Sequence, residues 1–173
     1  MNIIVAANSD WGIGLGGTQQ IVLPEDRRHF REITGNGAVI AGRKTLEDFP
    51  GGKPLPNRKN LVFTRRSDFK VDGAIVVHSV AELFPEISGD APDKVFVIGG
   101  GSIFNLLLPF CAFAYVTRID AAPPSDTFFP DLGAMPNWLL ESKSEPLKSG
   151  EVSYSFELYK NIAPKSIEEA IHV

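Results

Sequence analysis

The sequence predicts an α/β fold whose sheet is mostly parallel, with an antiparallel edge near the C-terminal end. Short runs of β-branched residues alternate with helix-like stretches, which is typical of parallel strands connected by helices. The last two predicted strands follow each other with no helix pattern between them, which favours the antiparallel edge. The chain has 173 residues, of which 43% are hydrophobic and 22% charged, so it suits one domain with a substantial core.

The elements are assigned in chain order from periodicity and from the residues that start or stop regular structure. The strands are expected near residues 2–7, 38–41, 60–64, 74–77, 95–98, 113–119 and 152–159. The helices are expected near residues 24–33, 43–48, 80–86 and 102–108. The Pro/Gly-rich segment 50–60 is short enough to be a connection within the domain.

The end of the chain is expected to lie outside this domain. Residues 1–161 form the predicted domain, and residues 162–173 form a C-terminal extension. Ser166 and Glu169 have the spacing of a capping box, so the extension is expected to contain a short helix. We assign no function to it.

Charge and composition narrow the class of protein. The formal net charge of −4 gives no support to general binding of nucleic acid or of an anionic membrane surface. No apolar run is long enough to span a bilayer, and the strand-like N-terminus has no basic region, so no signal peptide is expected. The one cysteine, Cys111, excludes an internal disulfide and lies in an apolar segment. The three histidines lack metal-ligand spacing, so we expect a metal-free, cytoplasmic protein.

The helix predicted at residues 24–33 carries a carboxylate on its apolar face. Pro24 suits the first helical position, where a missing N–H has no cost. At about 100° per residue, Asp26, Phe30 and Ile33 fall within one stripe roughly 60° wide. This segment alone leaves two interpretations open. Asp26 either complements the helix dipole only, or is a partly buried carboxylate that binds a cationic or amidine-like ligand.

The segment 95–108 predicts a phosphate-binding turn. A strand of the buried type runs into Gly99, Gly100 and Gly101, and a helix begins near Ser102. Glycines let the backbone approach a ligand closely, and the free N–H groups at a helix start can bind a phosphate. The alternative is a tight turn between strand and helix that binds nothing.

Two further strands end in polar and cationic residues. Ligands of open α/β sheets bind beyond the carboxyl ends of the strands, so these junctions and the glycine turn favour one ligand with several phosphates. A dinucleotide with an additional 2′-phosphate fits, with its pyrophosphate at the glycines and its ribose phosphate at the arginines. The residues are Gly42, Arg43, Lys44 and Thr45 at the first junction, and Thr64, Arg65 and Arg66 at the second.

Other motifs are rejected. "GIGLGG" at residues 12–17 lacks the helix that must begin inside a dinucleotide fingerprint, so we interpret it as a flexible loop. Such loops often act as lids, and the alternative is a plain surface loop. "GGGSIFN" lacks the lysine of a Walker motif. Ser102 has neither the spacing of a nucleophile elbow nor an indicated histidine or aspartate partner.

Several segments, taken together, resemble one known family. They are "IVAANSDWGIG", "LPEDRRHF", "VIAGRKTLEDF", "PLPNRKN", "VFVIGGGSIF", "YVTRID" and "DTFFPD". They occur in the order and spacing of dihydrofolate reductase over residues 1 to about 160, and the ordered set is highly specific. The resemblance implies a central, mostly parallel eight-stranded sheet with an antiparallel C-terminal edge and about four flanking helices. It also implies NADPH-dependent reduction of 7,8-dihydrofolate to tetrahydrofolate, which supports one-carbon metabolism and thymidylate synthesis.

The resemblance also implies the substrate site. Asp26 matches the single acidic residue of the pterin pocket, where a carboxylate can pair with the 2-amino group and the neighbouring ring nitrogen. Thr117 matches the threonine that supports this carboxylate. Arg58 matches the arginine that binds the α-carboxylate of the glutamate tail. The apolar walls of the pocket are matched by Val5, Ala6, Phe30, Phe49, Leu55 and Ile98.

On the cofactor side, the glycine turn 99–101 matches the pyrophosphate turn, whose first two glycines the family joins by a cis peptide. Arg65 and Arg66 fall where the family contacts the adenosine 2′-phosphate, so NADPH is preferred to NADH. Residues 14–20 match a mobile lid. The remaining cofactor positions are Ala7, Ile13, Gly14, Gly42, Arg43, Lys44, Thr45, Thr64, Ile98, Ser102, Ile103 and Phe104.

The implied mechanism gives the hydride chemistry to the cofactor and the positioning to the protein. Hydride passes from the nicotinamide to carbon 6 of the pterin, and the adjacent ring nitrogen gains a proton. Asp26 does not reach that nitrogen in the family's geometry. We expect it to raise the basicity of the substrate while water admitted by the lid delivers the proton.

The chain departs from the family at a few positions. Gln20 and Ile21 stand where many members have Pro-Trp, and Ile21 cannot donate the indole N–H that orders a pocket water. Arg27 replaces a residue that is usually apolar. It either stacks on the aminobenzoyl ring or reaches the glutamate tail, or it points to solvent. Phe104 stands where a tyrosine is common.

Two other functions compete with this interpretation. A related reductase of the same fold acts on a ribityl-aminopyrimidine and would share the glycine turn and NADPH, but Asp26 and Arg58 favour the folate substrate. A non-catalytic nucleotide-binding module would have lost the carboxylate, although Ile21 gives it slight support. An RNA-binding side activity gains nothing from the acidic composition. The expected partners are dihydrofolate and antifolate inhibitors, and a monomer is expected because no apolar repeat indicates a dimer interface.

Overall fold

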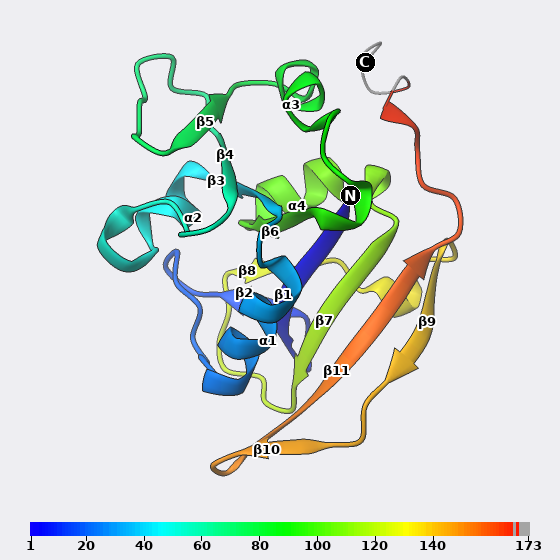
Figure 1. Cartoon of the computed structure of the whole chain (residues 1–173). Coiled ribbons are helices and arrows are strands. Elements are labelled where there is room, and N and C mark those ends of the chain that lie inside the picture. Colours follow the sequence, from blue (N-terminus) through cyan, green and yellow to red (C-terminus); the bar gives the residue numbers. More distant parts are fainter. Residues whose placement is uncertain (168, 170–173) are drawn as a thin grey trace.

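The computed structural model describes residues 1–167 and 169, and one large sheet runs through it (Figure 1). Eight strands form the path β10-β11-β7-β1-β6-β3-β4-β5, and β9 pairs with β11 off this path. β2 and β8 form a separate two-stranded sheet. The strands are β1 (Asn2–Asn8), β2 (Gly12–Gly14), β3 (Ala38–Gly42), β4 (Lys59–Phe63), β5 (Ala74–Val77), β6 (Val95–Gly99), β7 (Phe113–Ile119), β8 (Thr127–Phe128), β9 (Trp138–Lys143), β10 (Leu147–Ser149) and β11 (Val152–Asn161).

Four helices have bounds within the described residues, and each begins within one residue of its predicted start. They are α1 (Pro24–Thr34), α2 (Arg43–Glu47), α3 (Val80–Ile87) and α4 (Gly101–Leu107). Short 3₁₀ helices lie at η1 (Pro50–Gly52), η2 (Pro92–Lys94), η3 (Leu108–Phe110) and η4 (Leu132–Ala134). None of the helices in the described part of the chain is both long and apolar enough to cross a bilayer.

The predicted change from parallel to antiparallel pairing is confirmed. β1 lies parallel to β6 and β7, and β3 lies parallel to β6 and β4. β11 returns antiparallel along β7, with Phe156 opposite Thr117, and it also pairs antiparallel with β9 and β10. The chain up to Ile119 therefore builds the parallel part of the sheet, and the strands from Trp138 onward add its antiparallel edge.

Four strands differ from the sequence-based expectation. A loop was predicted for residues 12–17, and this is wrong for residues 12–14, which form β2 and pair with Thr127 and Phe128 of β8. β9 and β10 lie in a stretch for which no strand was predicted, and they are held by β11. These strands are short or largely exposed, so they carry little of the β-branched or alternating pattern that marks a strand.

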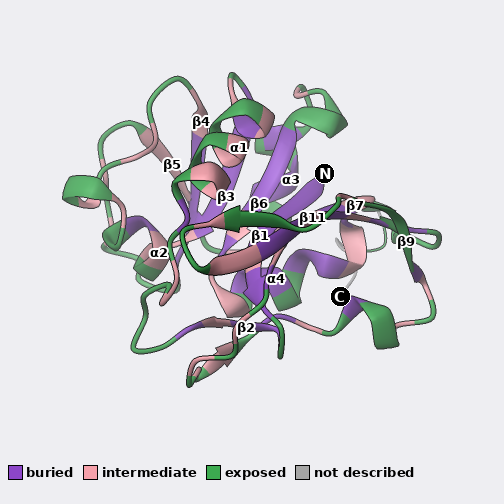
Figure 2. Ribbon diagram, turned by 90° about the horizontal axis from the view of Figure 1, so that it is seen from below, coloured by how far each residue is buried: buried purple, intermediate pink, exposed green. Residues whose placement is uncertain are grey.

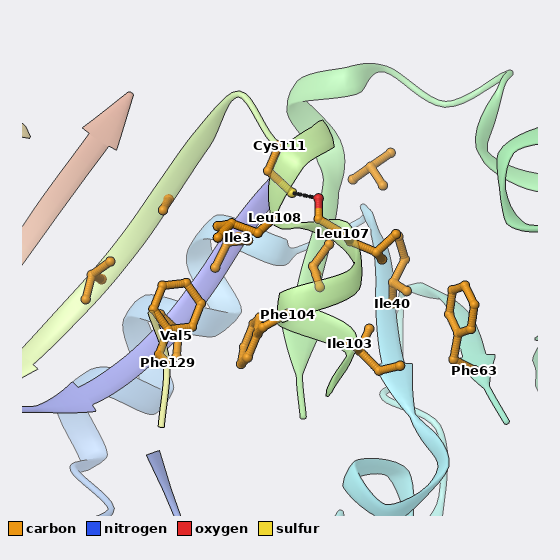
Figure 3. Close-up of a cluster of buried hydrophobic side chains, with 14 of the residues drawn as sticks. Ile3, Val5, Ile40, Phe63, Ile103, Phe104, Leu107, Leu108, Cys111 and Phe129 are labelled. Carbon is orange, nitrogen blue, oxygen red and sulfur yellow. Dashed lines mark hydrogen bonds between the residues drawn. The ribbon is translucent and has the colours of Figure 1, made fainter. Parts of the chain in front are cut away.

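Figure 2 shows that the central strands are largely buried, and their core side chains form one cluster on each face of the sheet. Side chains alternate between the faces, so Val5 and Ala7 belong to the main core cluster with Phe104 of α4, whereas Ala6 faces the other side. Figure 3 shows part of the main cluster, where the Cys111 thiol donates to the Leu107 carbonyl at 3.3 Å. Burial raises the pKa of Cys111 to about 12, so this thiol is structural.

The C-terminal extension shows the predicted capping contacts. The Ser166 N–H donates to Glu169 Oε2 at 2.7 Å, and the Glu169 N–H donates to Ser166 Oγ at 3.4 Å. The helix expected to follow falls largely on residues 168 and 170–173, which lie outside the described residues.

Candidate active site

The carboxyl ends of three neighbouring parallel strands lie together at one end of the sheet. β6, β3 and β4 are parallel neighbours, with Ala41 opposite Gly99 and Gly42 opposite Phe63. The glycine turn, the Gly42 junction and the Thr64 junction therefore lie side by side, as predicted. A single extended ligand placed along this edge can contact all of them.

The glycine turn is shaped for close approach of a ligand. Gly99 has a φ of 127°, which side chains rarely permit, and the Gly99–Gly100 peptide is cis, as the resemblance implied. A Cβ on Gly100 would lie 3.2 Å from Thr45 Oγ1, and one on Gly42 would lie 3.1 Å from Ile103 Cγ1. The starts of α2 and α4 thus converge on this turn. In α4 the N–H groups of Ile103 and Phe104 donate to the Gly100 carbonyl, and those of Gly101 and Ser102 precede this first hydrogen bond of the helix, so they can bind a pyrophosphate.

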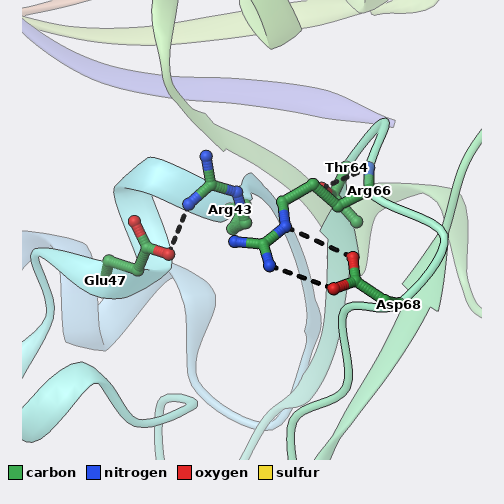
Figure 4. A network of polar contacts seen from close by, with 5 residues as sticks. All are labelled: Arg43, Glu47, Thr64, Arg66 and Asp68. Carbon is green, nitrogen blue, oxygen red and sulfur yellow. Dashed lines mark hydrogen bonds and ion pairs between the residues drawn. The ribbon is translucent and has the colours of Figure 1, made fainter.

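Cations follow the ends of β3 and β4, and two of them are held by carboxylates (Figure 4). Arg43 Nη1 lies 2.5 Å from Glu47 Oε1, one helical turn away. Arg66 donates from Nε and Nη2 to the two carboxylate oxygens of Asp68, at 3.3 and 3.1 Å. The hydrogen bonds of this pair raise the pKa of Arg66 and lower that of Asp68. The Arg66 N–H also donates to Thr64 Oγ1 at 3.1 Å, which fixes the backbone at the end of β4.

Asp26 lies on the other side of the site, against the sheet. Thr117 Oγ1 donates to Asp26 Oδ1 at 2.6 Å, across 91 positions of the chain. Thr117 is 2% exposed, and in the sheet it lies between Ala6 of β1 and Phe156 of β11. No described residue donates to Asp26 Oδ2. The carboxylate is therefore anchored by one oxygen and presents the other.

Burial is the dominant influence on Asp26. It raises the pKa of the carboxyl above its ordinary value, against the opposing effects of the Thr117 hydrogen bond, His29 and Arg27. A half-buried carboxylate with no direct cationic partner is costly in the folded protein. This outcome favours a ligand-binding role for Asp26 over a role as a plain dipole complement.

The apolar positions predicted for the pocket divide into two groups. Ala6, Phe30, Phe49, Leu55 and Ile98 are half-buried, so part of each remains open to contact. Val5 is buried in the main core cluster, on the opposite face of β1 from Ala6 and Thr117. The structure thus does not bring the Val5 side chain together with Asp26, because successive side chains of a strand point to opposite faces.

Arg58 is positioned beside α1 by its own contacts. Its Nε donates to Thr34 Oγ1 at 2.9 Å, its Nη1 donates to the Pro56 carbonyl at 2.7 Å, and its Cζ lies 5.7 Å from the centre of the Phe30 ring. Burial, with a smaller effect of the nearby Arg31, lowers the pKa of Arg58. A hollow of about 500 Å³ lies beside Leu55 and Arg58. Arg27 is exposed on the outer side of α1.

The predicted lid is attached to the chain around β8. The Gly16 N–H donates to Asp126 Oδ2 at 2.9 Å, and Leu15 pairs with Thr18. Ser125 Oγ donates to Gln20 Oε1 at 3.0 Å, and Gln20 Nε2 donates to the Pro124 carbonyl. Gln20, which departs from the family pattern, therefore ties the end of the lid to residues 124–125.

Sequence reasoning missed several residues around the site. The His29 ring stacks on Phe156 with 4.0 Å between ring centres, and burial lowers its pKa. Its spacing of three residues from Asp26 is a signal that could have indicated it. The Arg118 guanidinium lies 3.8 Å from the centre of the Trp11 ring at the base of β2. No sequence pattern predicted this contact, because it joins two distant segments.

Comparisons with known proteins show the family to which the chain belongs. The family model described as dihydrofolate reductase matches residues 1–161. A dihydrofolate reductase of Bacillus subtilis is 37% identical over 135 residues, which cover 78% of this chain and 77% of the relative. One of Mycobacterium tuberculosis is 37% identical over 127 residues, covering 73% and 75%. A solved structure, dihydrofolate reductase from Enterococcus faecalis complexed with NADP(H) and RAB-propyl, matches with a TM-score of 0.82 and 32% identity, covering 92% of this chain and 95% of that one.

Proposed function

Since the chain belongs to the dihydrofolate reductase family and reduces 7,8-dihydrofolate with NADPH, we propose that Asp26 is the residue that positions the pterin. The observation that carries this proposal is the carboxylate anchored by Thr117 on the apolar face of α1. Oδ1 accepts from Thr117, so Oδ2 can accept from the pterin edge. A ring nitrogen and its 2-amino group together match the two oxygens of a carboxylate.

Thr117 holds the Asp26 carboxylate in place through its hydrogen bond to Oδ1. Its hydroxyl proton is used by Asp26, so its oxygen can accept a hydrogen from the pterin amino group. Because Thr117 is buried between two neighbouring strands, its position is set by the sheet. We assign Asp26 and Thr117 as the catalytic residues, both in contact with the substrate.

Asp26 acts on the reaction through charge. NADPH supplies the hydride when it is bound. An ionised carboxylate beside the pterin favours protonation of the ring system, and water delivers the proton to the nitrogen next to the reduced carbon. The raised pKa of Asp26 brings its ionisation closer to the working pH than that of an exposed aspartate.

The cofactor is assigned to the edge formed by β6, β3 and β4. The turn of Gly99, Gly100 and Gly101 binds the pyrophosphate. A Cβ atom on Gly100 or Gly101 would crowd the side chains of Thr45 or Thr127 beside this turn. Arg65 and Arg66 bind the 2′-phosphate, which supports the preference for NADPH over NADH. The remaining contacts are assigned to Ala7, Ile13, Gly14, Gly42, Arg43, Lys44, Thr45, Thr64, Ile98, Ser102, Ile103 and Phe104.

The tail of the substrate is assigned to Arg58. Its contacts with Thr34 and Pro56 fix the guanidinium beside Phe30, and Nη2, which has no hydrogen-bond partner among the described residues, can bind the α-carboxylate. Arg27 adds charge at the outer side of the same helix, where it can reach the tail. Residues 14–20 act as the lid. Phe30, Phe49, Leu55, Ala6, Ile98 and the backbone at Val5 form the pocket walls.

The same assignment extends to partners and organisation. We propose that the protein binds antifolate inhibitors in the Asp26 pocket and works as a cytoplasmic monomer, since one chain supplies every proposed site residue. Residues 1–161 form its domain, in agreement with the span of the family match, and residues 162–173 are an extension. Light scattering on the purified protein tests the monomer.

The test is the rate of NADPH absorbance loss when 7,8-dihydrofolate is added to the purified protein. Asp26→Asn is measured beside it, and Asp93→Asn serves as a matched control because Asp93 is exposed at the amino end of β6, the opposite end of the sheet. We expect turnover in the wild type and the control, and its collapse in Asp26→Asn. Equal rates in all three proteins would overturn the role of Asp26. No wild-type turnover, with NADPH still bound, would instead favour the related pyrimidine reductase or a cofactor-binding module.

A further inference from the structure

One of the arginines assigned to the cofactor, Arg66, already forms an ion pair with a carboxylate of the same chain, Asp68. Asp68 binds Arg66 side-on, through both of its oxygens, and takes up Nε and one proton of Nη2 (Figure 4). Paired nitrogens of this kind are what a guanidinium offers to a phosphate. The geometry with which Arg66 would best bind a 2′-phosphate is therefore already satisfied within the chain.

The pair also cancels charge where an anion should bind. Beyond β4, Arg65 and Arg66 add two positive charges and Asp68 subtracts one within hydrogen-bond distance of Arg66. A 2′-phosphate placed there would meet the repulsion of the carboxylate as well as the attraction of the guanidinium. At the neighbouring junction Glu47 forms an ion pair with Arg43 and so cancels part of its charge. Glu47 also lies near enough to raise the pKa of Arg66 through its negative charge.

Nothing in the fold requires Asp68 to stay on Arg66. Its side chain is 73% exposed and that of Arg66 is 57% exposed, so the pair is not part of the core. The Arg66 backbone is held independently by its bond to Thr64 Oγ1. An exposed pair of this kind contributes little to stability and can open when a stronger anion arrives.

We propose that Asp68 competes with the 2′-phosphate of NADPH for Arg66 and thereby sets how strongly the protein prefers NADPH to NADH. The proposal rests on the assignment of Arg66 to the 2′-phosphate. Arg65 forms no ion pair within 4.0 Å among the described residues, so it makes the first contact with the phosphate. Arg66 joins when Asp68 swings away. Asp68 is then a specificity-determining residue that limits affinity instead of adding to it.

The experiment measures equilibrium binding of NADPH and of NADH to the full-length protein without substrate, by calorimetry. Asp68→Asn keeps the size of the side chain and one hydrogen-bond acceptor but removes the charge. We expect its Kd for NADPH to fall about two- to fivefold at low salt, as for other exposed charge pairs, while its Kd for NADH stays the same. The gain should shrink as salt is added, because both charges are exposed. Asp93→Asn, the same change at the far end of the sheet, should alter neither constant.

Two results would overturn the proposal. One is NADPH binding by Asp68→Asn that is unchanged or weaker, which would mean that the carboxylate is neutral or orients Arg66 favourably. The other is an equal gain for NADPH and NADH, which would place the effect away from the 2′-phosphate. Arg66→Gln separates this failure from that of the proposed function. If Arg66→Gln weakens NADPH but not NADH, the 2′-phosphate assignment stands and only competition by Asp68 fails. If it leaves NADPH binding unchanged, both fail.

Discussion

The two sides of the site hold charge in opposite ways. On the substrate side a single half-buried carboxylate, Asp26, is held by the neutral hydroxyl of Thr117. On the cofactor side several cations follow the strand ends, and two of them, the half-buried Arg43 and the exposed Arg66, are paired with carboxylates. The substrate side therefore has one charge without a cationic partner, and the cofactor side has several charges that are in contact with solvent.

This difference predicts how each side should respond to change. A charge with little solvent around it interacts strongly and is poorly screened by salt, so its removal should have a large effect on binding and catalysis. An exposed, paired charge gains little from each contact, and salt weakens it further. The substrate side should therefore depend on single residues, and the cofactor side on the sum of several.

The largest expected effect is that of Asp26→Asn on catalysis. We expect kcat/KM for dihydrofolate to fall about 100-fold or more, because the variant cannot stabilise positive charge on the pterin. NADPH binding should stay within about twofold of the wild type, since the cofactor edge does not include this residue. Steady-state kinetics and direct cofactor binding check the two halves. A parallel loss of NADPH affinity would break the proposed separation of the two sides.

Thr117→Val should have an intermediate effect. The change keeps the shape of a buried side chain but removes the donor to Asp26, and we expect kcat/KM to fall about tenfold. Because the lost hydrogen bond lowers the pKa of Asp26, that pKa should rise further in the variant. The acid limb of the profile of kcat/KM against pH should then move to higher pH. An unmoved limb would show that Thr117 does not act through the carboxylate.

Arg65→Gln sharpens the comparison from the cofactor side. We expect its Kd for NADPH to rise about three- to tenfold at low salt and the difference from wild type to fade at high salt. Its Kd for NADH and the KM for dihydrofolate should not change. Fluorescence titrations at two salt concentrations measure this, and a loss shared by NADH would argue against a contact with the 2′-phosphate.

The smallest expected effect is on stability. The pKa of Asp26 is raised in the folded protein, so its contribution to stability is full below its unfolded pKa and is lost as pH rises through its folded pKa. At neutral pH the ionised carboxylate is therefore a cost. Asp26→Asn should be as stable as the wild type or more so at pH 7, by about 1–4 °C in Tm, and the difference should vanish in acid. A lower Tm for the variant at pH 7 would contradict the assigned environment.

The sequence predicted those features that depend on local pattern. Proline, an acidic first turn and a stripe containing Phe30 are all visible within one helix, and the three strand ends are visible as runs that stop at glycine or at cations. The bond between Asp26 and Thr117 joins residues 91 positions apart, so only the family resemblance indicated it. β2 and β8 are held by each other and carry almost no pattern of their own. The direction of Val5 required the register of β1, and the pairing of Asp68 required the course of the chain after β4.

The most direct test of the contrast between the two sides is the salt dependence of two binding constants on the same protein. One ligand is NADPH, and the other is 2,4-diaminopyrimidine, which offers an amidine-like edge to Asp26 and has no carboxylate tail. Between about 0.05 and 0.5 M salt we expect NADPH binding to weaken about tenfold and diaminopyrimidine binding to weaken less than about twofold. Equal weakening of both would contradict the account, because it would mean that Asp26 is as exposed to solvent as the arginines beyond β4.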